Sequence, residues 1–196
     1  MSSRKDRELP PGQKPIKRLL RWGIDHHGII PKNPKIDLEK WSLVIDGEVQ
    51  NPVKLNWNDF LKLPKVESAS DFHCVEGWSV PDCKWEGVKF KEIIDFVRPK
   101  ENAKFVTFEC ADGYATSLTM EELSRENVLL AYKLNGQELE EGLGWPLRLI
   151  VTDKYAYKSA LWVTRIKFTL KKEFGYWEVR GYSDTADVWK NDRFAR

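Results

Sequence analysis

The feature that most limits the fold of this chain is a series of short apolar segments separated by turn dipeptides. Apolar residues alternate between Trp41 and Ile45, a pattern typical of a half-buried strand. The dipeptides Asp46-Gly47, Asp112-Gly113 and Asn135-Gly136 favour tight turns because glycine accepts positive φ. A chain divided at such intervals has little room for long helices, and it is expected to build a sheet-rich domain.

Other segments predict further strands and a few short helices. Strands are expected at 104–110, 128–133, 147–151 and 162–170. In the last, Trp162, Thr164, Ile166, Phe168 and Leu170 would share one face, with Arg165 and Lys167 on a wet face. Helices are expected at 56–63, capped by Asn56 and ended by Pro64, at 90–97, and after a capping box at 119–122. These elements predict a single domain of the α+β class with a mixed sheet.

Length and charge set the domain plan. The 196 residues fit one domain at 21–196, preceded by a charged, proline-rich segment at 1–20. That segment is predicted to be a flexible arm, extended or disordered, or packed across the surface. With 32 Lys and Arg against 30 Asp and Glu, charge gives no reason to expect a nucleic-acid or membrane partner. The N-terminus shows no apolar stretch of signal-peptide or membrane-spanning length, and a cytoplasmic location is expected.

Three cysteines, Cys74, Cys83 and Cys110, argue against a disulfide framework, because their number is odd and small. They also lack the paired short spacings of a zinc site. A glycine-rich phosphate loop, a His-Glu-x-x-His motif and a nucleophile elbow are missing from the sequence. The common nucleotide-binding, zincin and hydrolase interpretations are therefore excluded.

Cys74 is the first candidate for chemistry. It lies in a stretch without a clean helix or strand period, between His73 and Glu76, with Gly77 permitting an unusual backbone. A thiolate is a good ligand for a soft or high-valent transition metal. The alternative is a buried structural cysteine. Cys110, at a predicted strand end beside a turn, is expected to be buried or to line a pocket.

Arg148 and Lys158 form the second candidate group. Arg148 lies between Leu147 and Leu149, so its side chain should point away from the apolar side of the strand. A guanidinium there suits bidentate binding of a phosphate, and Lys158 would add a point charge. The alternative is a pair of solvated surface cations.

His26 and His27 are the third candidate. Adjacent residues on an extended chain point in opposite directions, so the two imidazoles are not expected to share a metal ion. One of them can hydrogen-bond a polar ligand. The alternative is an exposed loop.

Taken in order, these segments resemble the oxidoreductase molybdopterin-binding fold of the sulfite oxidase-like superfamily, from about Trp22 to the C-terminus. The segments that carry the resemblance are 26–31, Phe72-His73-Cys74-Val75-Glu76-Gly77-Trp78-Ser79, Asp112-Gly113-Tyr114, 144–151, 154–159, Gly175-Tyr176-Trp177-Glu178 and 180–183.

The resemblance implies a molybdenum centre bound by one molybdopterin, which supplies a dithiolene, and by a cysteine that Cys74 matches. Arg148 and the Lys158-Ser159 turn match segments that hold the pterin and its phosphate. Asp25, His26 and His27 match an N-terminal segment at the same cofactor, and Cys110 would lie near it. Tyr114 falls where sulfite oxidases place a tyrosine near the metal's oxo ligand.

Two departures bear on the substrate and the cofactor. Asp25 stands where sulfite oxidases are expected to have an arginine, and Glu76 would repel sulfite. The Cys-Val-Glu-x-Trp-Ser form is closer to the bacterial branch that contains the periplasmic methionine-sulfoxide reductase, which usually carries an export signal not seen here. Leu143 and Leu161 replace polar residues that are common in the family.

The resulting prediction is a molybdenum-dependent oxidoreductase that transfers an oxygen atom to or from a small substrate, such as an S- or N-oxide. Cys74, Tyr114 and Glu76 are the predicted catalytic residues, with Tyr114, Glu76 or a nearby histidine steering protons. The alternatives are sulfite oxidation, and a non-catalytic cofactor-binding module, which Leu143 and Leu161 favour. Because the sequence has no haem-attachment Cys-x-x-Cys-His, a separate electron-transfer partner is expected. A monomer or weak dimer is also expected, since no dimerisation domain follows.

Overall fold

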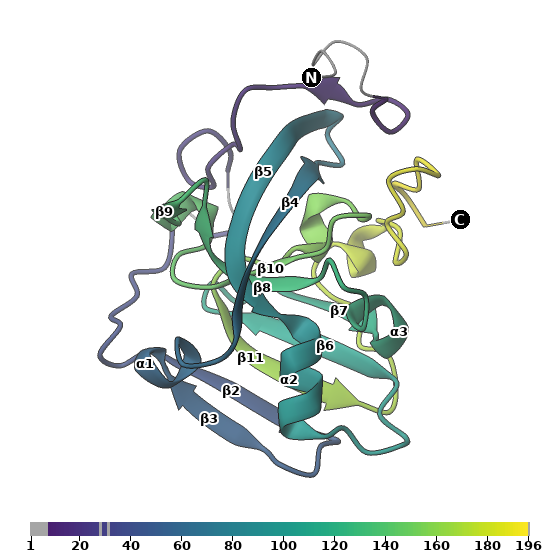
Figure 1. Cartoon of the computed structure of the whole chain (residues 1–196). Helices are drawn as coiled ribbons and strands as arrows, with labels where there is room; N and C mark the ends of the chain where they lie inside the picture. Colours follow the sequence, from purple (N-terminus) through teal and green to yellow (C-terminus); the bar gives the residue numbers. More distant parts are fainter. Residues whose placement is uncertain (1–7, 28, 31, 196) are drawn as a thin grey trace.

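The computed structural model describes residues 8–27, 29–30 and 32–195, and its strands form two sheets (Figure 1). In the first sheet the order is β1-β5-β8-β10, with β4 paired to β5 and β9 paired to β8. Its strands are β1 (Lys14–Pro15), β4 (Lys65–His73), β5 (Trp78–Lys89), β8 (Leu129–Leu134), β9 (Gln137–Glu138) and β10 (Arg148–Ile150).

The second sheet has the order β3-β2-β11-β6-β7. Its strands are β2 (Ser42–Gly47), β3 (Val53–Asn56), β6 (Phe105–Cys110), β7 (Ala115–Thr119) and β11 (Val163–Thr169). β11 pairs in parallel with β2 and antiparallel with β6, so the sheet is mixed. Figure 1 shows this sheet across the lower part of the view, with the long β4–β5 hairpin rising above it.

The helices are short. The α-helices are α1 (Trp57–Phe60), α2 (Phe90–Val97) and α3 (Met120–Leu123), and the 3-10 helices are η1 (Glu141–Leu143), η2 (Ala156–Lys158) and η3 (Glu178–Arg180). In α2, residues Phe90, Ile93 and Val97 are completely buried. Their spacing places them on one helical face, which explains why this segment is helical.

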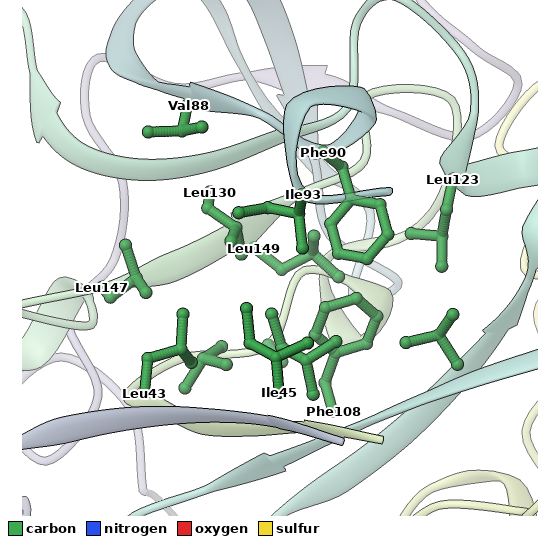
Figure 2. Packing of buried hydrophobic residues seen from close by; sticks show 14 of the residues in the cluster. Leu43, Ile45, Val88, Phe90, Ile93, Phe108, Leu123, Leu130, Leu147 and Leu149 are labelled. Atoms are coloured by element: carbon green, nitrogen blue, oxygen red, sulfur yellow. The ribbon is translucent and has the colours of Figure 1, made fainter. Parts of the chain in front are cut away.

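The main core lies between the two sheets and α2 (Figure 2). Leu43 and Ile45 reach it from β2, Phe108 from β6, and Leu149 from β10. Leu149 is fully buried here, whereas its strand neighbour Ile150 belongs to a second apolar cluster. The first sheet therefore has apolar packing on both faces, and a polar side chain on β10 has no wet face to occupy.

Several sequence-based expectations are confirmed. The Asn56 side chain accepts from the Asp59 N–H at 2.9 Å, as expected of a helix cap. The capping box at 119–122 is present, and the helix at 90–97 has the expected bounds. Asn135 and Gly136 both have positive φ and join β8 to β9 in a two-residue hairpin. The α+β class with a mixed sheet and short helices holds.

Three expectations need correction. Gly47 does not form a two-residue turn; it lies in β2, where a Cβ would meet the Phe168 carbonyl oxygen at 2.2 Å, and residues 48–52 connect β2 to β3. Leu170 is 48% exposed, because β11 ends at Thr169. The helix expected at 56–63 is shorter, since regular helix stops at Phe60.

Part of the N-terminal segment packs along the first sheet. Lys14 N–H donates to the Gly77 carbonyl at 2.9 Å, and Ile16 N–H donates to the Ser79 carbonyl at 2.8 Å. Leu19 is buried in the second apolar cluster. Residues 14–15 are thus extended and paired with β5, and residues 1–7 lie outside the described part, so the flexibility of the segment stays a prediction.

Candidate functional site

Cys74 lies in the tight turn between β4 and β5. Its N–H donates to the Trp78 carbonyl at 2.8 Å, and its own carbonyl accepts from the Gly77 N–H at 3.0 Å. Gly77 has φ +98°, and a Cβ there would lie 3.1 Å from the Gly12 carbonyl oxygen, so glycine suits this position. The turn buries the Cys74 side chain to 7% exposure at the end of the hairpin.

One carboxylate oxygen of Glu76 lies close to Cys74, Trp78 and His26. Glu76 Oε2 lies 4.0 Å from Cys74 Sγ and accepts from Trp78 Nε1 at 3.1 Å. His26 Nε2 lies 3.0 Å from the same oxygen, in a contact without hydrogen-bond alignment. Burial raises the pKa of the Cys74 thiol to about 12, and the nearby carboxylate acts in the same direction.

The two histidines diverge, as the sequence indicated. The His26 ring packs between Trp22 and Trp78, with ring centroids 5.3 Å and 6.2 Å away, whereas His27 is exposed. The prediction that adjacent imidazoles would not share a metal ion agrees with this geometry. Gly28 and Pro31, which belong to the same family segment, lie outside the described residues.

Asp25 is held by two arginines. It accepts from Arg18 Nη1 at 2.7 Å and from Arg21 Nε at 3.0 Å. These hydrogen bonds hold the pKa of the Asp25 carboxyl well below its usual range. These contacts shape the 21–26 turn, and the predicted role of Asp25 at the cofactor stays a prediction.

A small pocket, with a volume of about 40 Å³, lies beside this turn. It is lined by Trp22, Ile29, Asp112, Tyr114, Ala156, Tyr157, Ser159, Ala160, Leu161, Trp162 and Trp177. Trp22 belongs to the lining and also packs on His26, which contacts Glu76. The predicted residues Tyr114 and Ser159 therefore share one pocket, and Trp22 and His26 connect it to the Cys74 turn.

Tyr114 forms part of the buried pocket wall. Its hydroxyl donates to the Tyr157 carbonyl oxygen, and its N–H donates to Asp112 Oδ1 at 2.9 Å. Burial raises the pKa of Tyr114 well above its ordinary value, so it is a hydrogen-bonding phenol at neutral pH. Cys110 is buried behind it, and its N–H donates to the Tyr114 carbonyl at 2.9 Å.

Arg148 points away from Leu147 and Leu149, as predicted, but into the interior. Its guanidinium stacks over Phe72 at 4.9 Å and Trp85 at 5.4 Å. It donates to the Leu143 carbonyl at 2.9 Å and, at 3.4 Å, to that of Ser159. Burial lowers its pKa to about 10. The surface-cation alternative is wrong for Arg148, because the strand is covered on both faces.

Lys158 is also buried, with its charge matched by acids. Its ammonium contacts Glu178 Oε1, lies 3.4 Å from Asp184 Oδ1, and donates to the Ser117 carbonyl at 3.1 Å. Both Lys158 and the Glu178 side chain are nearly inaccessible to solvent. The surface-cation alternative is wrong here too, and the predicted role of Lys158 at a phosphate stays a prediction.

The structure adds Arg193 and Gln13 to the Cys74 turn, and sequence reasoning missed both. Arg193 Nη1 donates to the Val75 carbonyl at 2.6 Å, and Gln13 Nε2 donates to the Cys74 carbonyl at 3.1 Å. Both residues lie far from Cys74 in the sequence and in segments without periodicity. No local pattern points to either of them.

Two kinds of feature are absent from the described part of the chain. Within residues 8–27, 29–30 and 32–195, no helix is long and apolar enough to cross a membrane. The same residues contain no group of three or more His, Cys, Asp and Glu side chains placed to hold a metal ion.

Curated relatives match most of the chain. It is 38% identical over 186 residues to the uncharacterized oxidoreductase YuiH of Bacillus subtilis, covering 95% of this chain and 91% of that protein. It is 32% identical to the putative protein-methionine-sulfoxide reductase subunit YedZ1 of Azospira oryzae, over 76% of this chain and 56% of that one. It is 31% identical to the protein-methionine-sulfoxide reductase catalytic subunit MsrP of Campylobacter jejuni, over 82% of this chain and 59% of that one.

A solved structure shares the fold. The sulfane dehydrogenase SoxCD of Paracoccus pantotrophus superposes with a TM-score of 0.67 at 21% identity, over 76% of this chain and 42% of that one. This chain thus spans little more than half the length of the two methionine-sulfoxide reductase relatives, and less of SoxCD.

A family model matches the central part of the chain. Residues 27–177 match the oxidoreductase molybdopterin binding domain, which contains Cys74, Tyr114 and Arg148. The expected family resemblance is confirmed, and with it the expectation of an oxidoreductase. The chain belongs to the family of oxidoreductase molybdopterin-binding domains.

Proposed function

We propose that this chain is a molybdenum-cofactor-dependent reductase of small S-oxides, with Cys74 as the protein thiolate on the metal. The observation that carries the proposal is the set of polar groups at Cys74. A carboxylate, Glu76, approaches the thiol, and an imidazole and an indole contact that carboxylate. A sulfoxide is neutral, so a carboxylate does not repel it as it would sulfite. The relatives named as methionine-sulfoxide reductases support the same substrate class.

The residues present fit an anionic cofactor. Arg148 is 2% exposed, its Nε has no hydrogen-bond partner among the described residues, and its Nη groups donate to two main-chain oxygens. A buried cation without a matched anion is costly, so this site favours a ligand that brings negative charge, such as the molybdopterin phosphate. Ser159, whose carbonyl accepts from Arg148, also belongs to the pocket lining. Cys74 supplies the soft donor that molybdenum requires.

When bound, the molybdenum cofactor supplies a metal that exchanges two electrons and an oxygen atom with a small substrate. Reducing a sulfoxide to a thioether consumes two electrons and two protons and releases one water, so this chain must hold the substrate and deliver protons. Glu76 suits proton delivery because its side chain is 51% exposed and reaches the Cys74 thiol. Tyr114 and the indoles of Trp22 and Trp177 form a largely apolar wall suited to the carbon groups of a sulfoxide.

Sulfite oxidation is the competing activity within the same family. Its dianionic substrate requires cations with free donors near Cys74. Arg193 lies near that thiol, but its guanidinium donates to the Val75 and Gly12 carbonyls and to Asn191 Oδ1. The S-oxide assignment is therefore favoured over sulfite oxidation. A non-catalytic module remains the alternative from another class, and the experiment below separates the three.

The supply of electrons belongs to the proposal as well. We propose a separate electron-transfer partner, because relatives of this family are named as subunits of larger reductases. A monomeric state and a cytoplasmic location stay predictions. Light scattering of the purified chain and fractionation of producing cells check them.

The test compares two buried cysteines. The protein is produced in a host that makes molybdopterin, molybdenum is measured by plasma mass spectrometry, and the oxidised pterin by fluorescence. Sulfoxide reduction is followed with a reduced viologen dye as electron donor. Cys74→Ala is expected to lose sulfoxide reduction by about a thousandfold or more while remaining folded. Cys83→Ala is the matched control, because burial raises the pKa of that thiol to about 12 as well.

Each outcome decides between the functions. Molybdenum and pterin near one per chain, with activity lost only in Cys74→Ala, supports the proposal. Arg148→Met should reduce the pterin content, since it removes the buried cation. Sulfite turnover without sulfoxide reduction would replace the proposed substrate. Folded protein that carries neither molybdenum nor pterin would favour the non-catalytic module.

A further inference from the structure

Arg193, near the C-terminal end, joins three segments that lie far apart in the sequence. Its Nη1 donates to the Val75 carbonyl at 2.6 Å, and its Nη2 donates to the Gly12 carbonyl at 3.3 Å. Figure 1 shows the C-terminal segment (yellow) near the upper end of the β4–β5 hairpin, where the N-terminal segment also passes. One guanidinium thus holds the carbonyl next to Cys74 and the backbone of the segment that pairs with β5.

The guanidinium is itself fixed. Arg193 Nε donates to Asn191 Oδ1 at 2.8 Å, and the same oxygen accepts from the Tyr155 hydroxyl at 3.0 Å. Its carbon lies 5.6 Å from the centre of the Tyr155 ring, which is completely buried. The backbone around it is a closed loop, since Ser183 N–H donates to the Arg193 carbonyl at 3.0 Å. A planar guanidinium with three of its donor groups engaged loses little conformational freedom when it binds the two carbonyl oxygens.

The neighbouring glycine fits this contact. Gly12 has φ +73°, and a Cβ there would lie 2.9 Å from Arg193 Nη2. Gly77, in the Cys74 turn, would bring a Cβ to within 3.1 Å of the Gly12 carbonyl. The three segments therefore pack too closely for side chains at these two positions, and the Arg193 fork closes the remaining gap.

We propose that Arg193 is a positioning residue that fixes the turn carrying Cys74 through the Val75 and Gly12 carbonyl oxygens, and that the C-terminal segment forms one wall of the site. The inference rests on the proposed function for its catalytic meaning. Its physical content, the rigidity of the 74–77 turn, is measurable without cofactor or substrate. A cation that holds backbone oxygens here keeps Glu76 and the Cys74 thiol in register.

Two substitutions at Arg193 separate the effect of its forked hydrogen-bond donors from the effect of its positive charge. Arg193→Met removes both at similar length, and Arg193→Lys keeps the charge on one donor group. The matched control is Arg180→Met, in the same C-terminal segment. Arg180 stacks on the Tyr176 ring at 3.6 Å and donates to the Tyr176 carbonyl, so its contacts do not include the Cys74 turn.

The first measurement uses cofactor-free protein. Hydrogen exchange of the Cys74 and Gly77 amides, and alkylation of Cys74 by iodoacetamide, are mapped by mass spectrometry. Arg193→Met should raise both rates about tenfold, the effect of losing one or two hydrogen bonds in a local opening. Arg193→Lys should lie between, and Arg180→Met should match the unchanged protein. The α2 amides should not change in any variant.

Unchanged exchange and alkylation in a folded Arg193→Met protein would overturn the proposal. If Arg193→Met does not fold, the exchange and alkylation rates of Arg193→Lys are compared with those of Arg180→Met. Equal rates in these two variants would overturn the proposal.

The second measurement uses loaded protein. A loosened turn should change the paramagnetic resonance signal of partly reduced molybdenum, and should lower kcat for a sulfoxide more than it raises KM. A loosened turn with an unaltered signal would reduce Arg193 to a structural residue and overturn its positioning role. Loaded protein that reduces no sulfoxide would defeat the proposed function alone, because the exchange and resonance results still test Arg193.

Discussion

At the scale of single residues, two buried cations behave in different ways. Lys158 lies against Glu178 and Asp184, so its charge is matched within the protein. Arg148 stacks on two aromatic rings and donates to two main-chain carbonyls. Removing Lys158 leaves a buried carboxylate without its partner, whereas removing Arg148 leaves only neutral acceptors. Lys158 is therefore expected to stabilise the folded state through its charge pair, whereas Arg148 has no carboxylate partner among the described residues.

We expect Lys158→Met to lower the free energy of unfolding by about 3–5 kcal/mol, because the Glu178 carboxylate is left buried and unpaired. Denaturant titration of cofactor-free protein measures the loss. The double variant Lys158→Met with Glu178→Gln should recover part of it. Lys172→Met, which breaks a more exposed pair with Asp184, is the control and should cost less. A loss in the double variant equal to that in Lys158→Met would contradict this account.

At the scale of elements, α3 shows how one turn of helix is held in place. Thr119 Oγ1 accepts from the Glu122 N–H at 3.1 Å, and the Glu122 side chain accepts from the Thr119 N–H at 2.9 Å. Glu122 also pairs with Lys154 at 2.6 Å, and Lys154 donates to the Thr185 carbonyl at 2.5 Å. The capping box therefore connects α3 to the loop before η2 and to the C-terminal segment.

The Glu122–Lys154 pair makes the free energy of unfolding depend on pH. Burial acts to raise the pKa of Glu122, but the hydrogen bonds from Lys154 and Thr119 outweigh it and lower the pKa below 4.5. A carboxyl whose pKa is lower in the folded state contributes its full stabilisation at pH values above its pKa in the unfolded chain. That contribution disappears as the pH falls through the folded-state pKa. Below pH 4.5, the unfolding free energy should thus fall more steeply in the unchanged protein than in Glu122→Gln.

Thermal unfolding of both proteins at a series of acidic pH values measures this difference. Glu121→Gln removes an exposed carboxylate from the same helix and serves as the control. Parallel curves for Glu122→Gln and the unchanged protein would rule out the effect.

The sequence was most informative where local chemistry decides the structure. Asn56, the 119–122 box and the Asn135-Gly136 turn act through neighbours within three residues, and each is found as expected. β4 and β5 were missed because their alternation is masked by polar and charged residues, and because β5 is buried by partners on both sides. Gly47 was misassigned because its constraint comes from Phe168, more than a hundred residues away.

The candidate site shows the same limit. Residue type and family resemblance identified Cys74, Glu76, Tyr114 and Arg148, but not what surrounds them. Glu178, the acid that matches Lys158, and Arg193 reach the site through the tertiary fold. Pairing between distant segments leaves no periodic trace in a single sequence.

At the scale of the whole molecule, the two sheets share one core. Side chains from β2, β6 and β11 of one sheet meet side chains from β8 and β10 of the other, and α2 packs against the same core (Figure 2). Neither sheet can keep its inner face dry without the other. The described part of the chain should therefore unfold as one cooperative unit.

Phe108→Ala tests whether the two sheets unfold together, since Phe108 is fully buried and packs on Phe90 with ring centroids 5.5 Å apart. We expect a loss of about 3–5 kcal/mol in unfolding free energy. Far-ultraviolet circular dichroism and tryptophan fluorescence should shift to the same new midpoint in denaturant. Separate midpoints for the two signals would show that the sheets unfold independently.

The contact of Arg193 with Gly12 and Val75 also sets the order in which a newly made chain is completed. The ribosome makes the β4–β5 hairpin and its Cys74 turn long before Arg193, and domains begin to fold as they emerge. One side of the turn therefore stays open until Arg193 has been made and can bind the two carbonyl oxygens.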